Sequence, residues 1–170
     1  MTLNDGESES ATGNELVITR VLNAPRERIW RAWTEPERVK LWWGPMYFTS
    51  PLCQIDLRAG GKYLYCMRGP DGRDYWSTGV YREIVPPERI VCTDCFADEK
   101  GNVVPATYYG LGDNYPLEML VIVSLRARGD KTEFTLRHIG IPHGADRDNA
   151  RQGWSESLDK LAEVLARADG

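Results

Sequence analysis

The chain has 170 residues, of which 42% are hydrophobic and 27% are charged, so it suits one domain with a sizeable core. Its net charge of -4 disfavours nucleic acid and anionic membranes as partners, because both recruit lysine and arginine. No apolar run reaches the roughly 18 residues of a membrane span, and the first residues lack the basic-then-apolar order of a secretion signal. We therefore expect a cytoplasmic protein without membrane insertion, with residues 1–13 as a polar, disordered tail and residues 14–170 as one domain.

The first elements predicted are a strand and a short helix. Glu15–Leu22 is short and rich in β-branched residues, which is typical of a strand. Pro25 suits the first turn of a following helix. Ile29, Trp30 and Trp33 fall on one face of that helix.

A second short helix is expected directly afterwards. Thr34 and Glu37 have the T-x-x-E spacing of a capping box. Val39, Trp42 and Trp43 follow at helical spacing and would share one stripe, until a Gly-Pro pair ends the helix. We expect Trp42 to anchor this helix and Trp43 to turn toward a cavity entrance, although the spacing alone also allows the reverse.

The rest of the chain predicts six more strands and one long helix. Turn signals separate the strands, which indicates an antiparallel meander, at residues 47–59, 62–68, 74–85, 89–96, 117–128 and 132–139. Gly79 inside one strand indicates a bulge or the close approach of another element. Asp146–Ala168 has apolar residues at intervals of 4, 3 and 4, so we expect an amphipathic helix that covers the sheet.

Alternation along three strands predicts which side chains face inward. These are Tyr63, Tyr65 and Met67 on one strand, Met119, Val121, Val123 and Leu125 on the next, and Thr132, Phe134, Leu136 and His138 on the last.

The four cysteines are Cys53, Cys66, Cys92 and Cys95, and without a secretion signal we expect them to stay reduced. Cys92 and Cys95 form a C-x-x-C, whose alternative interpretation is a redox or zinc motif. On a strand, however, they face opposite sides, and no second pair completes a metal site. We therefore interpret them as core residues and predict no metal site and no cofactor.

The two histidines are the candidates for acid–base chemistry. His138 and His143 would form an acid–base pair if they met at the mouth of a cavity. The alternative is that His138 is a polar cap on the cavity and His143 a solvated loop residue. Asp56 is interpreted as a turn carboxylate.

Five stretches carry a family resemblance: "APRERIWRAWTEPERVKLWWGP", "DLRAGGKYLYCMRGPDG", "GVYREIVPPERIV", "LRHIGIP" and "RQGWSESLDKLAEVLA". Their order resembles the START-like (SRPBCC) superfamily. More narrowly, it resembles bacterial proteins similar to the C-terminal domain of the activator of heat-shock protein ninety ATPase. The resemblance implies an α+β helix-grip fold, a curved antiparallel sheet wrapped around a long C-terminal helix, with two short helices after the first strand. It also implies a cavity between sheet and helix that often takes a hydrophobic small molecule.

We expect that cavity to be lined by aromatic and apolar side chains with a few polar groups. The candidates are Trp43, Tyr63, Tyr65, Met67, Trp76, Tyr109, Met119, Val121, His138, Trp154 and Leu158. Residues 97–116 form a long connection that could fold over the entrance as a lid. From the residues alone, the alternative is a packed core without a cavity.

The expected function is non-catalytic binding of a hydrophobic or aromatic small molecule. One alternative is an enzyme of polyketide cyclase, dehydratase or hydrolase type in the same cavity. Another is a chaperone-contacting module, although the eukaryotic activator uses a separate N-terminal domain for much of its chaperone binding. A homodimer stays an open alternative, since no residue specifies an interface.

Overall fold

Seven antiparallel strands form one open sheet in the order β1-β7-β6-β5-β4-β3-β2. The computed structural model describes residues 15–167, so the expected tail at residues 1–13 lies outside the described residues. The elements are β1 Glu15–Leu22, α1 Arg26–Thr34, α2 Pro36–Val39, β2 Thr49–Ile55, β3 Lys62–Arg68, β4 Asp74–Val85, β5 Arg89–Ala97, η1 Ala106–Tyr109, β6 Met119–Arg128, β7 Lys131–Ile139 and α3 Ala145–Ala166.

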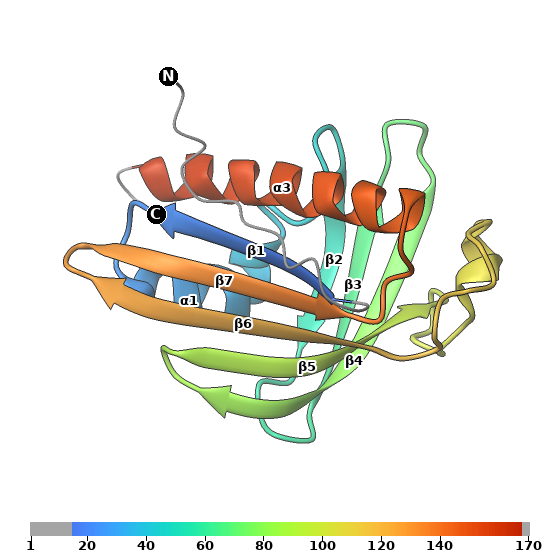
Figure 1. Cartoon of the computed structure of the whole chain (residues 1–170), viewed down its shortest axis with the longest axis horizontal. Helices are drawn as coiled ribbons and strands as arrows, with labels where there is room; N and C mark the ends of the chain where they lie inside the picture. The colour runs from blue at the N-terminus through green and yellow to red at the C-terminus, as the bar shows by residue number, and fades with distance from the viewer. Residues whose placement is uncertain (1–14, 168–170) are drawn as a thin grey trace.

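The sheet curves around the C-terminal helix (Figure 1). β1, β7 and β6 run along α3, while β2, β3 and β4 cross behind it at a steep angle. This is the helix-grip arrangement that the resemblance implies, with α1 and α2 between the first two strands. Within residues 15–167, none of the helices is long and apolar enough to cross a membrane.

Alternating burial places the core on the concave face of the sheet. On β7, Phe134 and Leu136 are fully buried and His138 is 6% exposed. On β6, Met119 and Val121 are buried as well. The inward faces predicted for these two strands are therefore confirmed. Side chains two positions apart on a strand point to the same face of the sheet, so these residues are buried together.

The second helix is shorter than predicted, and the capping box predicted from Thr34 and Glu37 does not form. α2 ends at Val39, and the hydroxyl of Thr34 donates to the carbonyl oxygen of Trp30, 2.7 Å away, so it cannot cap the next helix. Glu35 takes the cap position with no side-chain cap. The turn continues loosely, because the amides of Trp42 and Trp43 both donate to the carbonyl of Val39.

Gly79 lies where two strands and a side chain meet. A Cβ atom at this position would lie 1.9 Å from the carbonyl oxygen of Thr93 and 2.7 Å from the hydroxyl oxygen of Tyr63. The close approach predicted for Gly79 is therefore confirmed.

Candidate functional site

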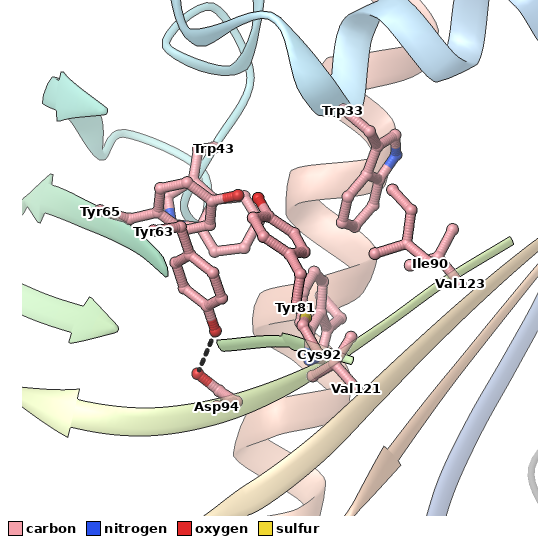
Figure 2. Close-up of a pocket in the computed structure, with 11 residues that line it drawn as sticks. Trp33, Trp43, Tyr63, Tyr65, Tyr81, Ile90, Cys92, Asp94, Val121 and Val123 are labelled. Carbon is pink, nitrogen blue, oxygen red and sulfur yellow. Dashed lines mark hydrogen bonds between the residues drawn. The ribbon is translucent and has the colours of Figure 1, made fainter. Parts of the chain in front are cut away.

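A small cavity lies between the concave face of the sheet and the helices (Figure 2). Its volume is about 40 Å³, which is room for about three water-sized groups, since one needs roughly 10–15 Å³. The lining side chains are Trp33, Trp43, Tyr63, Tyr65, Tyr81, Ile90, Cys92, Asp94, Val121, Val123 and Trp154. Six of these are aromatic, and Asp94 is the one carboxylate among them.

Three indole rings from different elements form one side of the cavity. Trp33 comes from α1, Trp43 follows α2, and Trp154 comes from α3. The ring of Trp43 is perpendicular to that of Trp33 and to that of Trp154, at centroid distances of 6.1 and 5.5 Å. The other two rings lie within 19° of parallel. The ring of Trp43 therefore lies across two nearly parallel rings.

The adjacent tryptophans after α2 point in different directions. Trp42 is fully buried, and its indole N–H donates to the carbonyl oxygen of Ala32, 3.0 Å away. Trp43 lines the cavity, with its ring 4.5 Å from that of Tyr65. The first indole thus ties the segment after α2 to α1, and the second supplies cavity wall.

Strand residues supply the opposite wall because alternate positions share a face. Tyr63 and Tyr65 project from β3 with stacked rings 4.5 Å apart. Their hydroxyls differ in partners: that of Tyr63 donates to the carbonyl oxygen of Thr93 at 2.7 Å. The hydroxyls of Tyr65 and Tyr81 lie close enough for each to influence the pKa of the other.

Burial keeps the proton on the acidic hydroxyl and thiol groups of the cavity. It raises the pKa of Tyr63, with a smaller contribution from Asp94, and it raises the pKa of Tyr65 and of Tyr81. Burial also raises the pKa of the Cys92 thiol to about 12. None of these four groups is therefore a ready nucleophile at neutral pH.

A chain of polar side chains runs from α3 to β5 along the cavity. The indole N–H of Trp154 donates to Nδ1 of His138, 3.0 Å away. On the other side of the ring, Nε2 lies 2.9 Å from Oδ2 of Asp94. This second contact has an ion-pair distance but lacks the alignment of a hydrogen bond. Oδ1 of Asp94 lies 3.4 Å from the hydroxyl of Tyr63 (Figure 2).

The hydrogen bond from Trp154 assigns the tautomer of His138. A ring nitrogen that accepts a hydrogen bond carries a lone pair, so Nδ1 is unprotonated and the proton lies on Nε2. The imidazole therefore presents an N–H to Asp94 without a formal positive charge.

The eleven predicted site residues fall into two groups. Those that line the cavity are Trp43, Tyr63, Tyr65, Val121 and Trp154. Those that do not line it are Met67, Trp76, Tyr109, Met119, His138 and Leu158. Of the second group, His138 reaches the cavity through Asp94, and Leu158 is fully buried in the core.

Six lining residues were missed: Trp33, Tyr81, Ile90, Cys92, Asp94 and Val123. Three of them could have been predicted from alternation on β5, because residues two apart on a strand share a face: Ile90, Cys92 and Asp94. Tyr81 is harder to place, because a register shift follows it on β4.

The residues expected near the entrance take other positions. Nδ1 of His143 contacts the guanidinium of Arg147 at 3.1 Å, whereas the partners of His138 are Trp154 and Asp94, so the two histidines form no acid–base pair. Tyr109 packs on Tyr75 and Phe96 instead of lining the cavity, so it covers the end of the concave face beyond Asp94.

Metal binding finds no support in the described part of the chain, where no three His, Cys, Asp or Glu side chains cluster around a common point. The four cysteines are free and buried.

The sheet, the gripping arrangement and the cavity between them define a START-like helix-grip domain. The chain belongs to the family described as activator of Hsp90 ATPase homolog 1-like protein, whose model matches residues 23–166. A comparison with curated proteins found no match.

Solved structures share the fold over nearly the whole chain. Protein CV1439 from Chromobacterium violaceum is 29% identical, with a TM-score of 0.73 over 91% of this chain and 98% of that one. Protein Ms6760 from Mycobacterium smegmatis is 24% identical, with a TM-score of 0.76 over 97% of both chains. The AHSA1 protein from Silicibacter pomeroyi is 22% identical, with a TM-score of 0.67 over 89% of this chain and 97% of that one.

Proposed function

We propose that the chain binds a small molecule with an apolar body in this cavity and releases it unchanged. The observation that carries the proposal is a cavity of about 40 Å³ whose wall is mostly aromatic. Ligand sites typically combine apolar and aromatic walls with a few placed polar groups. The family's fold, which is of a ligand-binding type, supports the same proposal.

The cavity's size limits the ligand. Its volume of about 40 Å³ suits a body of about three to four heavy atoms and is far below the roughly 300 Å³ of a drug-sized site. Trp43 is only partly buried and follows a short helix, so its movement would widen the cavity for a larger ligand.

The proposal of binding without turnover rests on the protonation of the cavity groups. Burial raises the pKa of the Tyr63 hydroxyl and of the Cys92 thiol, which leaves neither as an attacking group. An enzyme in the same cavity would have to use Asp94 as a base with His138 beside it.

Native mass spectrometry of the freshly purified full chain, followed by extraction of what it carries, tests the proposal. We expect a retained small molecule, and Trp43→Ala should weaken its retention. Trp76→Ala is the matched control, because it removes an indole that does not line the cavity. Equal retention in both variants would contradict the assignment of Trp43, and conversion of the extracted compound on incubation would indicate an enzyme.

A chaperone-contacting surface is the competing function outside the cavity. Exposed apolar side chains on the connection between β5 and β6 would provide such a surface, with Tyr108 and Leu117 both 58% exposed. Binding to the chaperone by an unliganded protein, unaffected by Trp43→Ala, would favour that function over ours.

A further inference from the structure

Asp94 is the group in the cavity that a ligand would complement most strongly. Its side chain is 19% exposed, so most of its hydration is lost. Among residues 15–167, no lysine or arginine is ion-paired with it. A carboxylate placed in an apolar wall without a cation is unfavourable unless hydrogen bonds or a ligand compensate it.

The neighbours of Asp94 compensate it only weakly. The tautomer of His138 brings an N–H without a formal charge, and that N–H is poorly aligned with the carboxylate. The hydroxyl proton of Tyr63 is directed to the carbonyl of Thr93 at 2.7 Å, which leaves only a 3.4 Å contact to Asp94. The carboxylate therefore keeps lone pairs for further donors.

The rest of the wall favours the same sign of charge. The faces of aromatic rings carry negative partial charge, and tryptophan attracts cations most strongly. Three indoles and three phenol rings surround the cavity. An anion would be repelled by these rings and by Asp94, whereas a cation would be attracted by both.

We propose that the cavity selects a small aliphatic ammonium ion, with Asp94 accepting its N–H groups and the aromatic rings enclosing its alkyl carbons. The inference rests on the proposed binding function and specifies its ligand class. The cavity of about 40 Å³ suits a chain of about three to four heavy atoms. An aliphatic amine of this kind is protonated at neutral pH.

The test compares two ligands of equal shape, propylammonium and 1-propanol, at matched ionic strength. Each is titrated into the full-length protein, and the indole N–H signals of Trp43 and Trp154 are followed by nuclear magnetic resonance. Cation–π attraction and a charge-assisted hydrogen bond together predict that propylammonium binds about tenfold more tightly. Equal affinities, or tighter binding of the alcohol, would overturn the inference.

Asp94→Asn keeps the size of the side chain and removes the charge, so it should abolish the preference for propylammonium over 1-propanol. Asp130→Asn is the matched control, because it removes the same charge from the exposed turn between β6 and β7. A preference that survives Asp94→Asn would also overturn the inference. If Asp94→Asn fails to fold, the comparison of the two ligands on the unaltered protein still decides.

The two proposals fail in different ways. If 1-propanol shifts the indole signals and propylammonium does not, the binding function stands and the cation preference is wrong. If neither ligand shifts any indole signal up to high millimolar concentration, the binding function and the cation preference both fail.

Discussion

The hydroxyl of Tyr63 occupies the space that a side chain at position 79 would fill, and only glycine at that position leaves room for it. Tyr63 and Gly79 are paired across β3 and β4. This contact lets the hydroxyl cross to the carbonyl of Thr93 on β5. One missing side chain therefore positions a cavity residue across three strands.

Gly79→Ala should lower the free energy of unfolding by about 1–3 kcal/mol, because Tyr63 or the backbone of Thr93 must shift. Urea unfolding measures this change. Gly153→Ala is the control: it lies inside α3, its Cβ would meet Pro45 at an ordinary 3.6 Å, and alanine favours a helix by about 1 kcal/mol. Equal effects of the two substitutions would contradict the steric argument.

Trp154→Phe should change the tautomer of His138, because Nδ1 loses the donor that fixes it. The ¹⁵N signals of the imidazole measure this directly, and stability should fall by about 1 kcal/mol or more. Trp33→Phe is the control, since the indole nitrogen of Trp33 has no hydrogen-bond partner within residues 15–167. An unchanged imidazole signal in Trp154→Phe would show that Trp154 does not set the tautomer.

Lys160→Met should loosen the segment between α2 and β2 from α3. The Lys160 ammonium donates to the carbonyl oxygens of Gly44, Pro45 and Phe48 at 2.9, 3.2 and 3.1 Å. Methionine keeps the apolar stem but removes the donors, so we expect a loss of about 1–3 kcal/mol. Amide exchange of residues 44–48 should quicken, whereas Lys131→Met, at the exposed start of β7, should leave it unchanged. Unchanged exchange in Lys160→Met would contradict the tether.

Stability should fall at alkaline pH. Burial raises the pKa of Cys92 from 9.0 to about 12 and also raises the pKa of Tyr63, so the unfolded chain loses these protons first. Stability is therefore full below about pH 9 and falls as pH rises toward the folded-state pKa, by about 1.4 kcal/mol per pH unit for each such group. Urea unfolding across this range measures the slope, and Cys92→Ser should reduce it. A flat profile would contradict the raised values.

Local patterns predicted the strands well, because both the alternation along a strand and the turns at its ends depend on residues that are close in the sequence. Lys62–Arg68 and Asp74–Val85 have the bounds expected from the sequence. The second helix failed because its capping box competes with a bond from Thr34 back into α1.

The candidate site was harder to predict because it depends on contacts between distant elements. Asp94 is an ordinary charged residue in a strand until register places it beside His138, 44 positions later in the chain. Trp33 had a predicted helical face, but only the packing of α1 against α3 turns that face into cavity wall.

The thiol of Cys92 forms part of the cavity wall, so its chemical reactivity would report how often the protein opens. A buried thiol reacts with an alkylating reagent only in molecules whose structure has locally opened. With the other three cysteines replaced by serine, the labelling rate of Cys92 would measure the opening frequency of the cavity. A bound ligand that prevents opening would slow this labelling in proportion to the fraction of protein that holds it. The labelling rate of Cys92 would therefore measure ligand binding.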